Sequence, residues 1–205
     1  MTTADTTADL QRAKTRVAVL ISGSGTNMVS LIEAGHKDDA AYEVVLVISN
    51  IDTAAGLEKA RSLGVEAVAV PHRDFGKNRE AHERAVQDVL AKAKIEVVAL
   101  AGYMRILTPY LVREWEDRML NIHPSLLPLY PGLDTHARAI AAGDAEAGCT
   151  IHIVTEGMDE GPVLGQARVP IQAGDTPEVL AERVKTAEHA LYPATLARFC
   201  AERLG

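Results

Sequence analysis

Asn121 and His123 stand two residues apart in the stretch NIHPSLLP, and both side-chain types can take part in acyl chemistry. On an extended strand, residues i and i+2 point to the same face, so the amide and the imidazole would lie side by side. Pro124 favours an extended backbone at His123 and ends the strand there. An imidazole exchanges protons near neutral pH, and an amide N–H can donate to a developing oxyanion. The stretch therefore predicts attack on a carbonyl-type carbon.

A carboxylate that could act with this pair is Asp159, in the glycine-bounded loop TEGMDEGP. A nearby carboxylate favours the charged form of an imidazole and fixes its orientation. An aspartate in such a loop is also common turn chemistry, so a plain turn residue is the alternative. Since no serine or cysteine stands in a nucleophile elbow motif, we interpret Asn121, His123 and Asp159 as catalytic residues. They would serve a direct acyl or formyl transfer between two bound substrates.

A second chemical feature is the loop Gly23-Ser24-Gly25-Thr26, which follows an apolar run and opens a helical pattern. Free N–H groups at a helix N-terminus favour an anion, and glycine lets an oxygen approach the backbone. The Gly-Lys-Ser/Thr of a Walker A loop is missing, and Met28 stands where a dinucleotide fingerprint needs its third glycine. The loop therefore predicts a monophosphate site, with a ligand-free strand-to-helix turn as the alternative.

Short, nearly continuous apolar runs separated by helical patterns predict the elements that would position these residues. Such runs are typical of strands buried on both faces of a parallel sheet. The expected strands cover 16–21, 43–49, 66–70, 95–101 and 118–123, and the expected helices cover 26–34, 53–63, 78–94 and 135–142. A hairpin over 149–155 and 162–171 would follow, and then a long helix with Thr176 as its N-cap. The alternation predicts an α/β fold with a Rossmann-like, doubly wound, mostly parallel sheet.

Composition narrows the class of protein. The chain has 205 residues, of which 47% are apolar, and a formal net charge of −7, which disfavours a nucleic acid as partner. Cys149 and Cys200 show neither metal-ligand spacing nor a disulfide framework, so we expect thiols in a reducing compartment. A secretory pattern and a run of about 18 apolar residues are both absent. We therefore expect a cytoplasmic protein without a membrane partner.

Five stretches in order resemble the phosphoribosylglycinamide formyltransferase family: VLISGSGTN, VVALAGYMRIL, LNIHPSLLPLYPG, DEGPVLGQARVPI and EHALYP. The similarity extends from about Arg16 to about Phe199. It implies transfer of a formyl group from 10-formyltetrahydrofolate to the amine of 5-phosphoribosylglycinamide in de novo purine biosynthesis. These two small molecules would be the substrates, and no metal is expected.

Residues 1–14 are polar and lack a core pattern, so we expect a flexible N-terminal tail that has no counterpart in the family. The resemblance implies that 15–205 form a single formyltransferase domain. Within that domain, 15–101 would form the phosphate-binding half. The C-terminal formyltransferase half, 102–205, would complete the folate cleft and carry the catalytic residues.

Individual residues match positions that the family uses. Asn121, His123 and Asp159 match the catalytic trio. The residues that match the ribonucleotide site are Gly25, Thr26, Asn27 and Glu188, and those that match the folate site are Arg79, Met104, Arg105, Ile106, Leu107 and Asn121. Without the family, the folate-side residues would be interpreted as ordinary apolar packing and as a solvated charge on a helix.

Two further points follow from the resemblance. It implies a cis peptide bond between Leu127 and Pro128. Many family members carry a histidine where this chain has Asp134, so no catalytic role is assigned to that position.

Other functions stay open at this stage. The main alternative is a hydrolase like formyltetrahydrofolate deformylase, which would carry a regulatory domain before the first strand, where this chain has only a short segment. A methionyl-tRNA formyltransferase would carry a basic pair in place of LYPG and a C-terminal RNA-binding domain. A non-catalytic nucleotide-binding module would have no need of the trio. An oligomer is possible, and the sequence does not decide it.

Overall fold

The apolar runs of the first part of the chain form five parallel strands in the computed structural model, which describes residues 13–203. The first 12 residues of the expected tail lie outside the described residues. The strands are β1 (Thr15–Ile21), β2 (Tyr42–Ser49), β3 (Glu66–Ala69), β4 (Val97–Leu100) and β5 (Met119–His123). Each lies within two residues of its expected bounds. Strands β1, β2, β4 and β5 are mostly buried on both faces, as the pattern predicts, whereas β3 at the edge of the sheet is half-buried to exposed.

The expected hairpin extends the same sheet. Strands β6 (Glu146–Ile153) and β7 (Val163–Pro170) pair antiparallel with each other, and β6 pairs antiparallel with β5. The sheet has seven strands in the order β3-β2-β1-β4-β5-β6-β7. The predicted α/β class with a mostly parallel, doubly wound sheet is confirmed. Strand β6 begins before the expected residue 149 because Glu146 pairs with Pro170 and draws its neighbours into the ladder.

The expected helices are present, and two short elements were missed. The helices are α1 (Thr26–Gly35), α2 (Ala55–Ser62), α3 (Arg79–Lys92), α5 (Thr135–Ala142) and α6 (Pro177–Arg203). The missed elements are a 3-10 turn, η1 (His72–Phe75), and α4 (Pro109–Glu114). The start signal of α4 is visible in the sequence, because Thr108 stands in an extended conformation before a proline at the first helical position.

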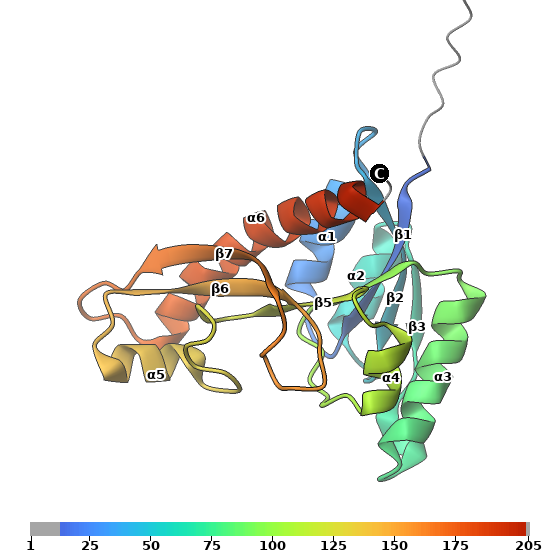
Figure 1. The fold of residues 1–205 in the computed structure, drawn as a ribbon, viewed down its shortest axis with the longest axis horizontal. Coiled ribbons are helices and arrows are strands. Elements are labelled where there is room, and N and C mark those ends of the chain that lie inside the picture. Colours follow the sequence, from blue (N-terminus) through green and yellow to red (C-terminus); the bar gives the residue numbers. More distant parts are fainter. Residues whose placement is uncertain (1–12, 204–205) are drawn as a thin grey trace, which may run out of the picture.

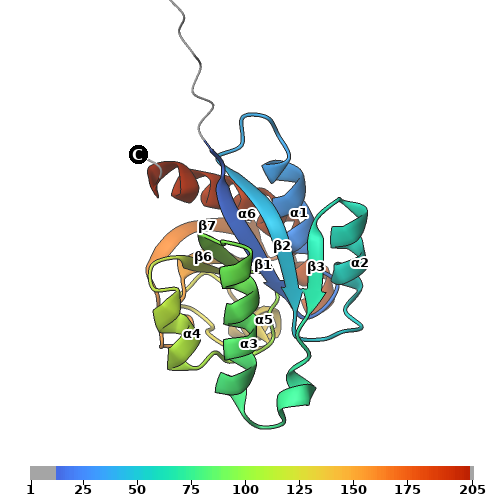
Figure 2. The ribbon, with the colours of Figure 1, turned by 90° about the vertical axis from the view of Figure 1, so that its right-hand side faces the viewer.

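The helices cover the sheet in two layers (Figures 1 and 2). Helices α3 and α4 lie against one face of the parallel strands, and α1 and α2 lie against the other (Figure 2). Helix α6 packs on the face of α1, where its buried side chains Leu180, Val184, Tyr192 and Leu196 join one hydrophobic core. Val86, Leu90, Leu111 and Trp115 of α3 and α4 join the second core. The central strands are therefore packed between two hydrophobic cores, one on each face of the sheet.

Both cysteines are part of the packed interior. Cys149 and Cys200 are fully buried free thiols, and burial raises the pKa of each to about 12. Neither thiol therefore ionises near neutral pH. Among residues 13–203 no helix is both long enough and apolar enough to cross a membrane.

Candidate functional site

The carboxyl ends of the parallel strands meet at one edge of the sheet, where the chain changes direction. In the sheet, β1 is flanked by β2 on one side and by β4 on the other. The Ser22 N–H donates to the Gly102 carbonyl at 3.1 Å, and the Met104 N–H donates to the Ser22 hydroxyl at 2.7 Å. Ligands bind at such a switch point in open α/β sheets. The glycine loop and the segment 102–107 therefore flank the expected crevice.

The alternation of side chains along β5 determines the face of the sheet to which Asn121 and His123 point. Leu120 and Ile122 belong to the core that contains α6. Because successive side chains of a strand point to opposite faces, Asn121 and His123 point to the other face. Helices α3 and α4 pack there mainly on β1, β2 and β4. At β5 the face is instead reached by the loops that carry Tyr130 and Asp159.

The structure brings the three candidate catalytic side chains to one place. The His123 Nδ1 atom lies 3.4 Å from Oδ2 of Asp159, and the two side chains are 7% and 12% exposed. Asp159 adopts the left-handed conformation, with φ at 57°. Its Oδ2 also accepts from the Gly132 N–H at 2.9 Å, which ties the loop after β6 to the loop after β5. The imidazole at the end of β5 and a carboxylate from the loop after β6 therefore share a largely buried site.

A histidine that the sequence reasoning left out joins them. His152 of β6 pairs across the ladder with Asn121, and its Nε2 lies 3.2 Å from the Asn121 amide nitrogen. Burial lowers the pKa of His152, against the opposing effect of its bond to the Ile153 carbonyl at 2.9 Å. The ring is therefore neutral, with Nδ1–H donating to that carbonyl and Nε2 accepting from Asn121. Its approach to Oδ1 of Asp159 at 3.7 Å is a contact of a neutral ring and not an ion pair.

The sequence did contain a signal for His152. Thr150 and His152 are polar residues two apart in an otherwise apolar strand. Such a pair on a buried strand places both polar side chains on one face. A strand that pairs with β5 in antiparallel register would set that face beside Asn121 and His123, but the register is visible only in the fold.

Polar contacts hold the proline-rich loop after β5. The Thr150 hydroxyl donates to the Ser125 carbonyl at 2.7 Å and accepts from the Leu127 N–H at 3.0 Å. The Gln166 amide donates to the Leu127 carbonyl at 2.8 Å. The Leu127–Pro128 peptide bond is cis, as the resemblance implied. The hairpin β6–β7 thus fixes the path of the loop that leaves His123.

The glycine loop opens α1 with its first-turn N–H groups free of any side-chain cap. Gly25 has φ at 67°, in the left-handed region that favours glycine. A Cβ at Gly25 would lie 3.2 Å from Cα of Gly56, which approaches because the Gly56 N–H donates to the Gly23 carbonyl at 3.0 Å. Conformation and crowding therefore both require glycine here. Thr26 and Asn27 follow as the first residues of α1, where an anion is favoured.

Asn27 and Glu188 meet although they are far apart in the sequence. The Asn27 amide of α1 donates to Oε2 of Glu188, on α6, at 2.7 Å. Glu188 is only 8% exposed, and its burial raises the pKa of the carboxyl group, while the bond from Asn27 opposes the rise. The two residues thus place a hydrogen-bonded carboxylate beside the glycine loop.

Glu188→Gln is expected to remove a pH dependence of stability that burial creates. Because the pKa of Glu188 is raised above its ordinary 4.5, the folded protein binds this proton more tightly than the unfolded chain does. Glu188 therefore contributes most to the free energy of unfolding when the pH is below the pKa of the unfolded chain. This contribution falls as the pH rises through the raised pKa of the folded protein. Glutamine does not titrate, so the variant's stability relative to the wild type should rise from about pH 4 to about pH 8 in urea titrations. A constant or falling difference would contradict the prediction.

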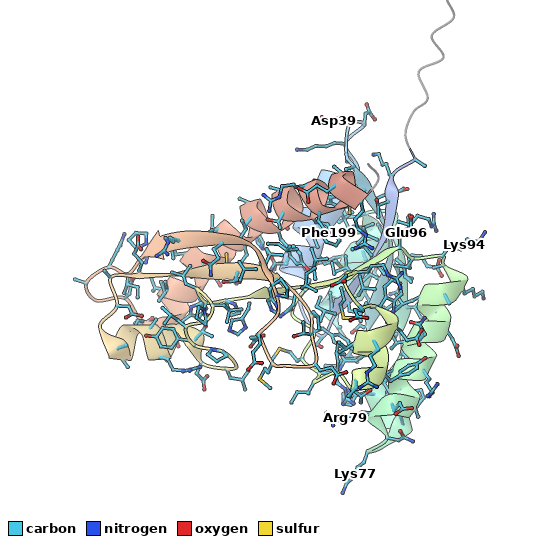
Figure 3. All side chains as sticks on the ribbon, in the orientation of Figure 1. Asp39, Lys77, Arg79, Lys94, Glu96 and Phe199 are labelled. Atoms are coloured by element: carbon cyan, nitrogen blue, oxygen red, sulfur yellow. The ribbon has the colours of Figure 1, made fainter. Side chains whose placement is uncertain are left out.

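The segment after β4 presents apolar side chains to solvent. Met104 and Ile106 are 67% and 64% exposed, while Arg105 and Leu107 are half-buried. Arg79, at the amino end of α3 (Figure 3), donates from Nη1 to the Ile106 carbonyl at 3.4 Å. The structure thus brings the predicted folate-side residues of two elements together.

Glu83 of α3 holds the end of this segment. Its Oε1 accepts from the Thr108 N–H at 2.7 Å, and its Oε2 accepts from the Thr108 hydroxyl. Only 3% of Glu83 is exposed. In the sequence Glu83 is a charged residue within an expected helix, so its contact with Thr108 is visible only in the fold. Among residues 13–203, no three His, Cys, Asp or Glu side chains are placed to hold a metal ion.

Comparison with known proteins shows similarity over nearly the whole chain. Residues 15–196 match the formyl transferase family. The chain is 44% identical over 188 residues to a phosphoribosylglycinamide formyltransferase of Escherichia coli, which covers 92% of this chain and 88% of that protein. A crystal structure of a phosphoribosylglycinamide formyltransferase from Brucella melitensis matches with a TM-score of 0.88 and 49% identity, over 92% of this chain and 97% of that one.

Similarity also extends to much longer proteins. The chain is 44% identical over 187 residues to a trifunctional purine biosynthetic protein adenosine-3 of Bos taurus. That match covers 91% of this chain but only 18% of the longer protein. The chain therefore spans less than a fifth of the trifunctional proteins that it matches.

Proposed function

Because the chain belongs to the formyl transferase family and matches phosphoribosylglycinamide formyltransferases over 92% of its length, we propose that it formylates the amine of 5-phosphoribosylglycinamide in de novo purine biosynthesis. 10-Formyltetrahydrofolate is the formyl donor. The observation that carries the proposal is the convergence of Asn121, His123 and Asp159 at the carboxyl edge of the sheet, near the switch point between β1 and β4.

Asn121 and His123 stabilise the charge that develops in the transfer. The neutral amine attacks the formyl carbon, a C–N bond forms, and the carbonyl oxygen becomes an oxyanion. Asn121 donates an amide N–H to that oxygen, since His152 takes the other amide hydrogen and so fixes the direction of the amide. The bond to the folate nitrogen then breaks, and the proton lost by the amine is returned to that nitrogen.

Asp159 sets a carboxylate beside Nδ1 of His123, at the place where charge develops in the reaction. The carboxylate lies 3.4 Å from Nδ1, so a proton at Nδ1 is stabilised by an opposite charge in a site of low water content. His123 thereby supports the oxyanion and carries the transferred proton, directly or through water. Both substrates are held at once, so the protein needs no covalent intermediate.

The glycine loop binds the 5′-phosphate of the ribonucleotide. The N–H groups of Gly25, Thr26 and Asn27 stand at the amino end of α1, where the helix dipole favours an anion. Glu188, held by Asn27, accepts hydrogen bonds from hydroxyl groups of the same substrate. The carboxylate thus recognises donors, and the free N–H groups recognise acceptors, on the same ribonucleotide.

The segment after β4 suits the folate. Met104 and Ile106 expose large apolar side chains that a flat ring system can cover, and Arg79 supplies a positive charge beside them. Arg105 and Leu107 complete the segment, and Asn121 lies on the neighbouring strand, where it pairs with Leu100 at the end of β4. When bound, 10-formyltetrahydrofolate supplies the formyl group to be transferred.

Gly25→Ala is expected to raise KM for the ribonucleotide by about tenfold, because an N–H bond to a charged phosphate contributes about that much affinity. The new Cβ would meet Gly56 and strain the left-handed backbone. Steady-state kinetics should show the change in KM for the ribonucleotide and little change in KM for the folate. Gly64→Ala is the matched control, since Gly64 has φ at 78° but open space around it. Equal KM values in the two variants would contradict the phosphate role of the loop.

The activity itself is tested by mixing the protein with 10-formyl-5,8-dideazafolate and following absorbance with and without 5-phosphoribosylglycinamide. Formyl transfer requires the signal to depend on the ribonucleotide, and mass spectrometry should find the ribonucleotide heavier by one formyl group. A signal that is independent of the ribonucleotide and yields formate would show a hydrolase instead. No signal under either condition would overturn the proposed function.

A further inference from the structure

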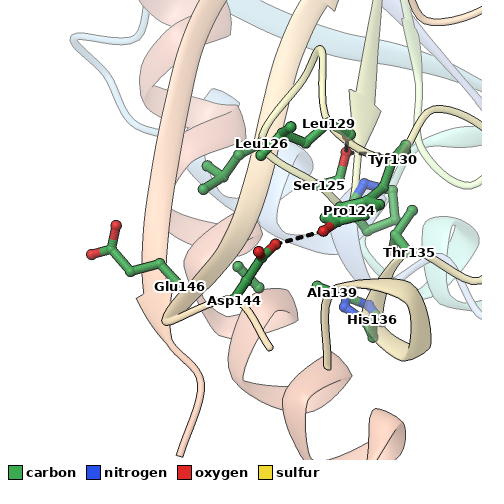
Figure 4. A pocket seen from close by; sticks show the side chains of 11 residues that line it. Pro124, Ser125, Leu126, Leu129, Tyr130, Thr135, His136, Ala139, Asp144 and Glu146 are labelled. Atoms are coloured by element: carbon green, nitrogen blue, oxygen red, sulfur yellow. Dashed lines mark hydrogen bonds between the residues drawn. The ribbon is translucent and has the colours of Figure 1, made fainter. Parts of the chain in front are cut away.

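We propose that Tyr130 and Asp144 are positioning residues for His123. Their side-chain hydrogen bond holds the Tyr130 carbonyl against Nε2 of His123, and this contact reserves Nδ1 for the proton that the reaction moves. The inference rests on the proposed function, in which His123 acts on the substrate. The Tyr130 carbonyl contacts Nε2 of His123, whereas Asp159 faces Nδ1. A hydrogen bond joins the side chains of Tyr130 and Asp144 beside a small pocket (Figure 4).

The backbone of Tyr130 stands in a conformation that its own residue type disfavours. Its φ is 54°, in the left-handed region, where a residue with a Cβ is strained. Such residues persist where surrounding contacts determine them, and they gather at functional sites. The turn directs the Tyr130 carbonyl toward His123, so the strain coincides with a contact to a proposed catalytic residue.

Contacts from the region of α5 hold this conformation. The Tyr130 hydroxyl donates to Oδ2 of Asp144 at 2.7 Å (Figure 4). The guanidinium group of Arg138 lies 5.2 Å from the centre of the Tyr130 ring and donates to the Pro131 carbonyl at 2.6 Å. The bond to Asp144 raises the pKa of Tyr130, in keeping with a phenol that donates to a carboxylate. Asp144 itself follows Gly143, which ends α5 in the left-handed conformation.

The Tyr130 carbonyl determines which nitrogen of His123 carries hydrogen. It lies 2.9 Å from Nε2, and a carbonyl oxygen only accepts, so Nε2 is protonated in the neutral ring. The nitrogen left without hydrogen is Nδ1, which faces Asp159 at 3.4 Å. A proton that arrives at Nδ1 forms the imidazolium next to the carboxylate. The opposite tautomer would place a lone pair against the carbonyl and leave no basic nitrogen beside Asp159.

His136 is the other polar group that could hold His123, and its contacts argue against that role. Its Nδ1 is buried and has no hydrogen-bond partner among residues 13–203. Burial lowers the pKa of His136, and the nearby His123 adds to this effect. A neutral ring without a bond to His123 does not fix its tautomer. The positioning contact is therefore the Tyr130 carbonyl.

Tyr130→Phe should lower kcat by about tenfold and change neither KM by more than about twofold, because small misplacement of a catalytic group costs rate more than binding. Nitrogen NMR of histidine-labelled protein should show that Nε2 of His123 is protonated in the wild type and that both tautomers are populated in the variant. A wild-type kcat, or an unchanged tautomer signal in the variant, would overturn the proposal.

The pair itself is tested by a double-mutant cycle. If the hydrogen bond is what matters, Asp144→Ala should lower kcat to the same extent, and Tyr130→Phe/Asp144→Ala should be no slower than either single variant. Effects that multiply would mean that the two residues act independently and would overturn the proposal.

Tyr42→Phe is the matched control for loss of a buried hydroxyl. The Tyr42 hydroxyl donates to the Leu31 carbonyl at 3.0 Å near the start of β2, at the opposite end of the sheet from the site. This variant should lose stability and keep its kcat. A comparable loss of kcat in Tyr42→Phe would show general destabilisation and contradict the positioning role. His123→Ala separates this proposal from the function: if that variant keeps wild-type turnover, the role of His123 itself fails, whatever Tyr130→Phe does.

Discussion

His123→Ala is expected to lower kcat by at least about 10²-fold, because a positioned acid–base group usually contributes about 10² to 10⁴ in rate. The substitution removes the imidazole whose Nδ1 lies 3.4 Å from Asp159 and which would face the oxyanion. Affinity for the ribonucleotide should survive, since the glycine loop lies after β1 and makes no contact with His123. Steady-state kinetics and calorimetric titration with the ribonucleotide measure the two quantities separately.

The control for this variant is His36→Ala. His36 is exposed and caps the carboxyl end of α1, whereas the glycine loop lies at the amino end of that helix. Its loss should therefore leave kcat unchanged. A His123→Ala protein with near wild-type turnover would remove the imidazole from the chemistry. A protein that loses ribonucleotide affinity as strongly as turnover would show that His123 serves binding and not the transition state.

Asn121→Asp is expected to lower kcat by about 10² to 10³, the usual cost of losing one oxyanion donor. Aspartate has nearly the same shape as asparagine, but it has no N–H to donate, and its charge opposes a developing oxyanion. It also leaves Nε2 of His152 without the amide hydrogen that it accepts. Turnover with both substrates saturating is the measurement, because the loss should appear in kcat.

Asn121→Ala distinguishes donation from shape. If the amide acts as a donor, the alanine and aspartate variants should both be slow, although only one of them keeps the volume of the side chain. An aspartate variant with wild-type kcat would show that Asn121 fills space. Only the aspartate variant places a carboxylate against Nε2 of His152, where it would favour a charged ring and a new ion pair. A slow alanine variant therefore shows that such a pair is not the cause of the loss.

Local patterns in the sequence determined the elements and part of the site. Continuous apolar runs predicted the parallel strands, and their bounds proved right within two residues for β1 to β5. The spacing of Asn121 and His123 on β5 placed both on one face, because a strand has a period of two. Gly25 marked a left-handed turn before a helix, which the structure contains. These features depend on neighbours in the chain, so the sequence alone displays them.

Only the tertiary structure decided which distant residues meet. The antiparallel register of β5 and β6 sets His152 beside Asn121, and a shift by one residue would turn its ring to the other face. The loop geometry that brings Asp159 to His123 and the packing of α6 on α1 that joins Glu188 to Asn27 both arise from long-range contacts. No pattern in the sequence indicates the left-handed backbone at Tyr130 or the contact of its carbonyl with His123. Such contacts follow from how layers pack, and packing depends on the whole chain at once.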